Sequence, residues 1–266
     1  MTQPPPTPLP RVATRRRRDE LLAHVRAGNG DINRLAERFG VSLSTIRRDL
    51  AALAGAGHLL RTYGGAATPG HFQEPSLRAK QSAHPDEKDA IGKHAASLVT
   101  AGDLLLLDAG TTVGRLAWHL RHCKGITVVT NGISSLLTLM DAPQVEVILL
   151  GGRLRRPNEA LLGSEVASAL RRYRPDLAFL GADGVDAVRG INCPSHEQAC
   201  IKEQMATSAR QTWVLADHSK LISEPYPFWA TQPPGTGIIT DQATPTQAAT
   251  LRQHDWDLIE VVAADG

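Results

Sequence analysis

Short apolar runs alternate with amphipathic stretches along residues 89–266. The apolar runs predict β-strands at 104–107, 126–130, 145–150, 177–180, 212–215, 237–240 and 258–262. Helical patterns lie between them at 112–120, 134–140, 165–171 and 197–208. Because the apolar residues of these strands do not alternate with polar ones and the strands are separated by helices, they predict a doubly wound α/β fold, with a mostly parallel sheet covered on both faces.

Residues 13–68 carry a different pattern, in which three short helices precede a strand and a glycine turn. The first helix is expected over 17–27, and Asp31 is placed to cap the second. Gly40 ends the second helix, and Ser42 can cap a third, whose apolar face repeats at helical spacing. The glycine-rich segment 57–66 completes a winged helix-turn-helix, with the helix-turn-helix at about 30–49.

The third helix presents polar side chains opposite its apolar face. The first turns of a recognition helix reach base edges in the major groove, where Arg can bond guanine through two donors. The alternative is that the serine is only a cap and the arginines are only solvated. The predicted DNA contacts are Ser42, Ser44, Thr45, Arg47 and Arg48 on the helix, with Arg61 and Tyr63 on the wing.

The charge of the chain supports this division. The 266 residues carry a formal net charge of only +2, yet residues 1–68 hold 11 Arg and 5 acidic residues, a net of +6. Residues 69–266 hold 18 basic and 22 acidic residues, a net of −4. A polyanion partner is therefore expected for the first part only. The run Arg15 to Arg18 is either an arm on phosphates or a solvated surface.

Several segments set the limits of the domains. Five prolines among the first ten residues predict a disordered tail over 1–12, and three prolines in 69–88 predict a linker. The globular parts are then 13–68 and 89–266. No apolar run reaches the roughly 18 residues of a membrane span, and no secretory signal is expected. Three cysteines, an odd and small number, favour a reducing cytoplasm.

The loops that follow the predicted strands are rich in Gly, Thr, Asn and Asp. Ligands of open α/β sheets bind beyond the carboxyl ends of the strands, and DAGTT at 108–112 opens a helix whose free N–H groups can hold a phosphate. Several such loops together favour a phosphorylated polar ligand. Neither G-x-G-x-x-G after a strand nor G-x-x-x-x-G-K-[ST] occurs, which disfavours a dinucleotide or a P-loop nucleotide.

Two sets of motifs resemble one known family. AERFGVSLSTIRRDLAALAGAGHLLRTYGGA resembles the DNA-binding domain of the DeoR-type bacterial transcription regulators, although Tyr63 stands where many members carry His. DAGTT, VVTNG, LLGGRLRRPNEALLG, FLGADGVD, the E-x-x-x-x-K of 197–202 and ADHSK resemble its sensor domain. That domain is related in fold to ribose-5-phosphate isomerase and glucosamine-6-phosphate deaminase.

The resemblance covers nearly all of residues 13–230 and implies an effector pocket for a sugar phosphate. Threonine hydroxyls and a helix N-terminus would take the phosphate, the acidic and amide side chains would meet sugar hydroxyls, and the lysine would pair with phosphate or an acid. The implied pocket residues are Asp108, Gly110, Thr111, Thr112, Thr130, Asn131, Gly151, Gly152, Asp183, Glu197 and Lys220.

Two other kinds of chemistry compete with this interpretation. Cys193, His196 and Cys200 have zinc-ligand spacing, but only three ligands are local, so neither metal nor cofactor is expected. Asp183 and Glu197 could serve as a general acid/base pair, which makes a sugar-phosphate isomerase or deaminase with an accessory DNA-binding domain the alternative.

We expect a homo-oligomeric transcription regulator without enzymatic activity or membrane contact. It is expected to repress a carbohydrate-utilisation operon and to bind operator DNA under the control of a phosphorylated sugar or polyol. A nucleic-acid-binding protein without an effector is a third hypothesis. Neither the sugar nor the operator is specified by the sequence, nor is repression distinguished from activation.

Overall fold

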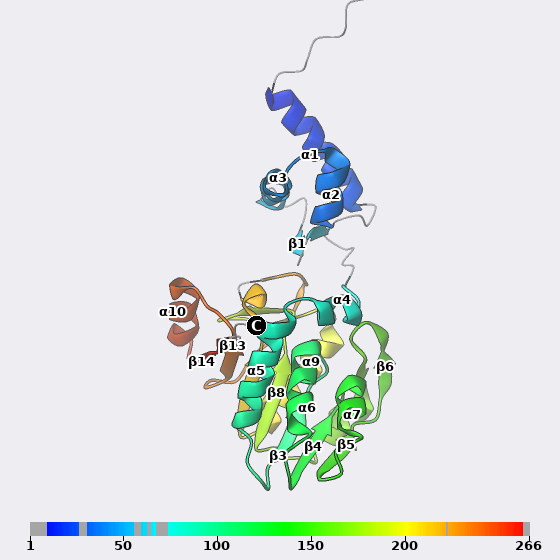
Figure 1. Cartoon of the computed structure of the whole chain (residues 1–266), viewed down its shortest axis with the longest axis vertical. Helices are drawn as coiled ribbons and strands as arrows, with labels where there is room; N and C mark the ends of the chain where they lie inside the picture. Colours follow the sequence, from blue (N-terminus) through cyan, green and yellow to red (C-terminus); the bar gives the residue numbers. More distant parts are fainter. Residues whose placement is uncertain are drawn as a thin grey trace, which may run out of the picture. The chain divides into compact units, whose positions relative to one another are not determined.

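The computed structural model describes residues 10–26, 31–55, 60–62, 65–67, 74–221 and 223–262. The chain divides into two compact units, residues 1–73 and 74–266 (Figure 1). Within the described residues, no helix is long and apolar enough to cross a membrane.

The first unit contains three helices and a two-stranded hairpin. They are α1 (Pro10–Arg26), α2 (Ile32–Phe39), α3 (Leu43–Gly55), β1 (Leu60–Thr62) and β2 (Gly65–Ala67), and the two strands pair antiparallel. This order confirms the predicted winged helix-turn-helix. The start of α1 differs from the prediction, because the helix begins at Pro10, inside the expected tail. Proline fits a first helical position, where its missing N–H would have no partner.

Capping and packing explain the helix-turn-helix. Asp31 accepts hydrogen bonds from the backbone of Asn33 and Arg34, at 3.0 and 2.9 Å, and so caps α2. Gly40 ends that helix in the left-handed conformation, with φ of 60°. The core is formed by apolar side chains from all three helices: Leu21, Val25, Leu35, Ile46, Leu50 and Leu53.

A parallel sheet of seven strands forms the centre of the second unit, as far as the structure describes it. The strands are β3 (Leu104–Leu107), β4 (Ile126–Thr130), β5 (Val145–Leu149), β8 (Leu177–Gly181), β11 (Gln211–Leu215), β13 (Gly237–Thr240) and β14 (Asp257–Glu260). Their spatial order is β14-β13-β11-β8-β3-β4-β5, and every pairing is parallel. The predicted doubly wound α/β class is confirmed.

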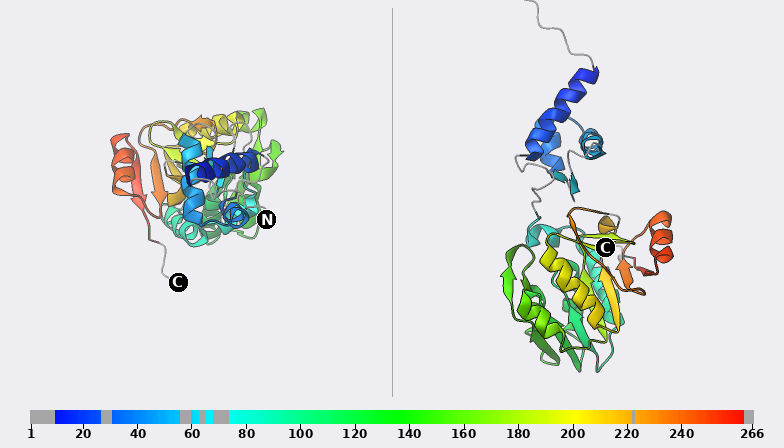
Figure 2. Two further views of the ribbon diagram at one scale, coloured as in Figure 1. Left: turned by 90° about the horizontal axis from the view of Figure 1, so that it is seen from above. Right: turned by 180° about the vertical axis from the view of Figure 1, so that it is seen from behind.

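Helices cover both faces of this sheet (Figures 1 and 2). Leu105 and Leu107 share one core with α5 (Pro85–Ser97), α6 (Thr111–Leu120) and α7 (Ile133–Leu139). Leu106 belongs to the opposite core with α8 (Ser164–Leu170), α9 (His196–Ser208) and α10 (Pro245–Gln253). This alternation along one strand explains why the central strand β3 is apolar at every position.

Several elements were not predicted. α4 (Leu77–Ser82) and the start of α5 occupy much of the segment expected as a linker at 69–88. Two small antiparallel sheets are formed by β6 (Arg153–Arg155) with β7 (Ala160–Leu162), and by β9 (Gly184–Asp186), β10 (Gly190–Cys193) and β12 (Phe228–Ala230). The short 3₁₀ helices η1 (Arg156–Asn158) and η2 (His218–Lys220) lie in loops that follow β6 and β11.

The strand order contains a switch point between β3 and β8. From β3 the chain proceeds to β4 and β5 on one side, and then returns to β8 on the other side. Asp108, directly after β3, donates its backbone N–H to Phe179 of β8 at 3.0 Å. Ligands of open α/β sheets bind in the crevice at such a point, beyond the carboxyl ends of the strands.

Candidate functional site

A polar pocket lies at the carboxyl ends of β3 and β8, at the switch point. Among the described residues, four of those that line it are lysines, and one is an acid. Its lining consists of Leu77, Lys80, Lys88, Ala109, Gly110, Thr111, Thr112, Asn158, Gly181, Ala182, Asp183, Gln198, Lys202 and Lys220. The lining has an excess of positive groups, which suits an anionic ligand.

The start of α6 contributes backbone donors to this pocket. Gly110 is the N-cap, and it provides no side-chain hydrogen bond to the first turn. Thr111 and Thr112 follow as the first helical residues and add their hydroxyls to the lining. A helix N-terminus of this kind favours a negatively charged group through its N–H donors and its dipole.

A buried ion pair joins the two loops at the switch point. Lys202 of α9 donates to the Asp108 carboxylate and to the carbonyl of Gly181, the latter at 2.7 Å. The backbone N–H of Gly181 also donates to Asp108, at 3.1 Å. Burial lowers the pKa of Lys202, but the attraction of Asp108 outweighs it, so the pKa is raised above its ordinary value. This raised pKa keeps Lys202 protonated, and its bonds to Asp108 and Gly181 fix the loops after β3 and β8.

A second ionic cluster connects the start of the second unit to the pocket. Lys80 of α4 donates to Asp183 at 2.6 Å and to Glu74 at 3.0 Å. Arg155 of β6 pairs with the same Glu74. Burial raises the pKa of Asp183, but the nearby Lys80 outweighs it and lowers the pKa below the ordinary range. This charged cluster involves a lining acid and a residue adjacent to the boundary between the units.

Lys88 is the most unusual cation of the pocket. It is buried, and its ammonium group donates to the carbonyls of Lys80 and Ala83, each at 2.5 Å. The pKa of Lys88 is lowered to about 8, chiefly by desolvation; the charge of Asp217 opposes this shift and the charge of Lys220 adds to it. An anion in the pocket would stabilise the protonated form of this side chain.

Some of the predicted effector residues lie behind the pocket lining. Thr130 is buried, donates to the carbonyl of Leu107 at 2.8 Å and accepts from Gly132 N at 3.0 Å. Asn131 is also buried and donates to the carbonyl of Leu161 at 3.2 Å. These bonds hold the loop after β4 against β3 and β7, which is a structural role.

The structure brings five of the eleven predicted residues into the pocket. Within the described chain, the lining includes Gly110, Thr111, Thr112, Asp183 and Lys220, whereas Asp108, Thr130, Asn131, Gly151, Gly152 and Glu197 lie outside it. Glu197 instead pairs with Arg153 at 2.5 Å and is partly exposed. A Cβ at Gly152 would meet the carbonyl oxygen of Leu162 at 2.6 Å, so close packing requires this glycine.

Sequence reasoning missed three lining lysines. Lys202 was the last residue of the E-x-x-x-x-K motif, but only the glutamate was assigned to the pocket. Lys80 and Lys88 lie in the segment predicted as a linker, to which no chemistry was assigned. A single lysine on a helix has no local signature, so the fold is needed to place these side chains.

Five of the seven predicted DNA-contacting residues lie at or just before the start of α3. Ser42 Oγ accepts from Thr45 N at 3.2 Å and lies 2.9 Å from the hydroxyls of Ser44 and Thr45, so it does cap the helix. Arg47 and Arg48 are exposed, while Ile46 between these polar positions is buried. Arg61 lies in β1 without a described side chain, and Tyr63 lies outside the described residues.

Two arginines of the basic run have a structural role instead. Arg17 and Arg18 of α1 donate to the buried carboxylate of Asp49 in α3, at 2.7 and 2.8 Å. These charge-assisted bonds hold α1 against the predicted recognition helix. The alternatives of a phosphate-binding arm or a merely solvated surface therefore do not describe these two side chains.

The zinc-like spacing gives no evident site. Cys193 is buried, and burial raises the pKa of its thiol to about 12. Cys200 is exposed and lies 3.7 Å from the ring of His196. Among the described side chains, these three do not form a group with metal-ligand distances.

Comparisons with known proteins agree with the two-part organisation. Residues 17–71 match the family model of the DeoR-like helix-turn-helix domain, and residues 83–242 match that of the DeoR C-terminal sensor domain. The chain is 38% identical to the HTH-type transcriptional repressor GlcR of Bacillus subtilis, over 78% of this chain and 80% of that protein. It is 36% identical to the HTH-type transcriptional regulator YgbI of Escherichia coli, over 86% and 90% of the two chains.

A third relative is named for a phosphorylated compound. The chain is 31% identical to the glycerol-3-phosphate regulon repressor of Escherichia coli, over 70% of this chain and 74% of that protein. Two family models in the expected order and three relatives over most of their length establish the membership. The chain belongs to the DeoR family of DNA-binding transcription regulators.

Proposed function

We propose that this regulator represses a carbohydrate-utilisation operon and that a phosphorylated sugar or polyol in the pocket controls its affinity for operator DNA. The observation that carries the proposal is the convergence of four lysines on the N-terminus of α6 at the switch point of the sheet. The name of the glycerol-3-phosphate regulon repressor, a relative over most of its length, supports a phosphorylated effector.

The pocket suggests a role for each part of such a ligand. The phosphate would accept from the N–H groups and hydroxyls of Thr111 and Thr112 and would be paired by Lys88 and Lys220. Sugar hydroxyls would bond with the polar side chains of Asp183, Asn158 and Gln198. Lys202, which pairs with the buried Asp108, would hold the loops after β3 and β8 in place beneath the ligand.

The charged cluster of Glu74, Lys80, Asp183 and Arg155 offers a path from ligand to DNA-binding unit. A phosphate that attracts Lys80 would weaken its bonds to Asp183 and Glu74, and Glu74 is the first residue after the boundary between the units. Effector binding would then shift an equilibrium between conformations of the regulator that differ in affinity for DNA.

The enzyme alternative receives less support from the side-chain partners. An isomerase would need Asp183 and Glu197 to act on one substrate, but Asp183 pairs with Lys80 and Glu197 pairs with Arg153. Of these two acids, only Asp183 is among the described lining residues. We therefore propose binding without turnover. Measurable isomerisation of a pentose or hexose phosphate, lost in Asp183→Asn, would contradict this.

We also propose a homo-oligomer that acts in the cytoplasm. Trp118 of α6 and Leu137 and Met140, in and just after α7, are large apolar side chains with half or more of their surface exposed. These helices pack against each other, and a second copy would cover such side chains. Sedimentation equilibrium should show an oligomer that Leu137→Glu dissociates; a monomeric wild-type chain would contradict the proposal.

A thermal-shift screen tests the effector proposal. Among a panel of sugar and polyol phosphates, at least one should raise the melting temperature of the full chain, and the unphosphorylated sugar should not. Thr111→Val combined with Thr112→Val should remove the shift, because the phosphate loses two hydroxyl donors. The matched control is Thr138→Val on α7. If no phosphate in the panel raises the melting temperature, the proposal is contradicted.

A further inference from the structure

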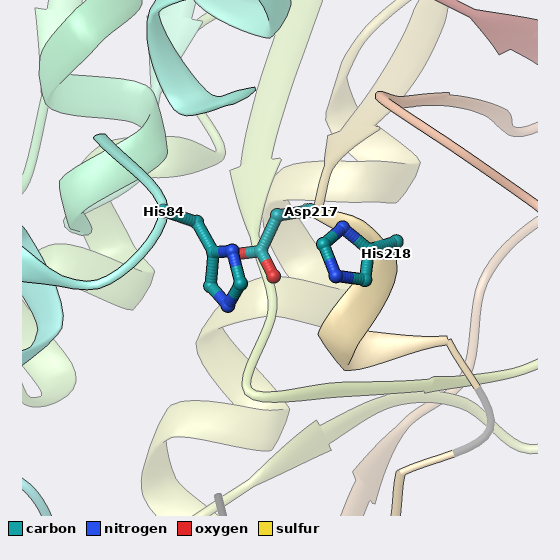
Figure 3. A group of neighbouring side chains, drawn as sticks. All are labelled: His84, Asp217 and His218. Atoms are coloured by element: carbon teal, nitrogen blue, oxygen red, sulfur yellow. The ribbon is translucent and has the colours of Figure 1, made fainter. Parts of the chain in front are cut away.

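His84, Asp217 and His218 form a compact cluster in which no chemistry has yet been assigned (Figure 3). His84 precedes α5, while Asp217 and His218 follow β11. One ligand atom of each side chain lies within 4.8 Å of the others. The rings of the two histidines lie edge to face, with centroids 4.8 Å apart. None of the three belongs to the described lining of the effector pocket.

Asp217 contains an unsatisfied acceptor at the centre of this cluster. Its side chain is buried, with 1% of the residue exposed, and its Oδ1 accepts from the backbone N–H of Ser219 at 3.1 Å. Its Oδ2 is also buried and has no hydrogen-bond partner among the described residues. A buried carboxylate oxygen without a partner is costly, so a bound cation would satisfy it.

Each histidine is hydrogen-bonded to a carboxylate other than that of Asp217. His218 Nδ1 lies 2.5 Å from Asp241 Oδ2, and the backbone N–H of His218 donates to the other oxygen of Asp241 at 2.7 Å. His84 Nδ1 lies 3.3 Å from Glu87 Oε1. Histidines that ligate metals typically donate their second ring nitrogen to a carboxylate, which fixes the ring and the tautomer. Here both rings have a carboxylate partner on Nδ1, so Nε2 is the nitrogen that would bind the ion.

The charges around the cluster are compatible with a divalent ion. Three carboxylates face it, from Asp217, Asp241 and Glu87, and the nearby cations are Lys88 and Lys220. The ammonium group of Lys88 already donates to two backbone carbonyls. Two imidazole nitrogens and one carboxylate oxygen are a ligand set typical of zinc with an open fourth position.

We propose that His84, Asp217 and His218 bind Zn²⁺, with water in the fourth position. Zinc–nitrogen bonds of about 2.0–2.1 Å require the ligand atoms, which lie within 4.8 Å of one another, to approach more closely when the ion binds. The ion would join the start of α5 to η2, the element that also supplies Lys220 to the effector pocket. This site goes beyond the proposed effector function and does not depend on it.

The experiment uses the full chain, stripped with a chelator and then titrated with Zn²⁺ alone. We expect one equivalent to bind per chain and to raise the melting temperature, and Co²⁺ to give a visible absorption band of low-symmetry coordination. His84→Gln and His218→Gln should each weaken binding by more than about 100-fold, and Asp241→Asn by about 10–100-fold. His196→Gln and Cys200→Ser are matched controls and should bind normally.

Three results would overturn the proposal. They are the absence of saturable binding of one equivalent, unchanged affinity in both histidine variants, and loss of binding in the His196→Gln control alone. The melting temperature of each metal-free variant must match that of the metal-free wild type. If His218→Gln does not fold, His84→Gln in its half-buried turn provides the same test, and normal zinc affinity there would overturn the proposal.

Discussion

At the scale of single residues, burial gives Lys88 an unusual property. Desolvation lowers the pKa of its ammonium group to about 8, so the side chain loses its charge in a mildly alkaline range. Only the protonated form attracts a phosphate, and the second pKa of a phosphate ester, about 6, leaves the ligand dianionic above pH 7. The affinity for the effector should therefore depend on pH through the protein.

We predict that effector affinity falls as pH rises through about 8. The fall is at most about tenfold per pH unit, because one proton is linked to binding. Lys88→Met should weaken binding at pH 7 and flatten the dependence above pH 7. Lys93→Met, an exposed position on the same helix, should change neither. Isothermal titration of chelator-treated protein measures this, and an equally steep pH profile in Lys88→Met would contradict the assignment.

A second residue-scale prediction concerns DNA. Arg47 is exposed on α3, next to the buried Ile46, so its removal should leave the fold intact. If Arg47 reads a base, Arg47→Ala should cost about 1–3 kcal/mol of specific DNA binding. Fluorescence anisotropy on selected DNA measures this, with Arg38→Ala on α2 as the control. Equal losses on specific and random DNA would instead indicate a phosphate contact.

The sequence predicted the position of the candidate pocket more closely than the side chains that line it. The loop at 108–112 and Asp183 were found because they follow apolar strands, whose carboxyl ends must meet at one edge of the sheet. Lys80, Lys88 and Lys202 were missed, because a lysine enters the pocket only through the packing of its helix. Asp108 was predicted to bond with sugar hydroxyls, whereas in the structure it pairs with Lys202. The sequence could not indicate this pair, because a partner 94 residues away has no local signature.

At the scale of elements, buried strands were the easiest to predict and α5 was missed. The central strands β3 and β8 are apolar throughout because both faces of the sheet are covered. α5 begins at Pro85, inside the segment 69–88 that was expected to be a linker, and it contains Gly92, a weak helix former. Packing explains this glycine, since a Cβ there would meet Leu116 N of α6 at 2.7 Å.

The different surroundings of Gly92 and Gly114 predict opposite effects of replacing each by alanine. Gly92→Ala should destabilise the second unit by about 1–3 kcal/mol, because the added methyl group forces α5 away from α6. A Cβ added at Gly114 in α6 would meet no atom within 4 Å. Gly114→Ala should therefore stabilise that unit by about 0.5–1 kcal/mol through helix propensity. Urea unfolding measures both values. A neutral Gly92→Ala would mean that the two helices can separate freely.

At the scale of the whole molecule, the chain joins a DNA-binding unit to a unit that we propose binds the effector. The basic and mildly acidic parts of the chain correspond to these two functions. The described residues at the start of the second unit include Glu74 and Lys80, which bond with each other and with Asp183 and Arg155. The central claim is that a phosphorylated ligand in the pocket changes the affinity of the other unit for DNA.

The most direct measurement is the affinity of the full chain for DNA selected by it from a random library, with and without the effector found in the thermal-shift screen. We predict that the effector weakens this binding in the wild type. Thr111→Val combined with Thr112→Val should bind the same DNA with unchanged affinity and should not respond. Equal affinity of the wild type with and without a saturating bound effector, or a full response in the double variant, would contradict the account.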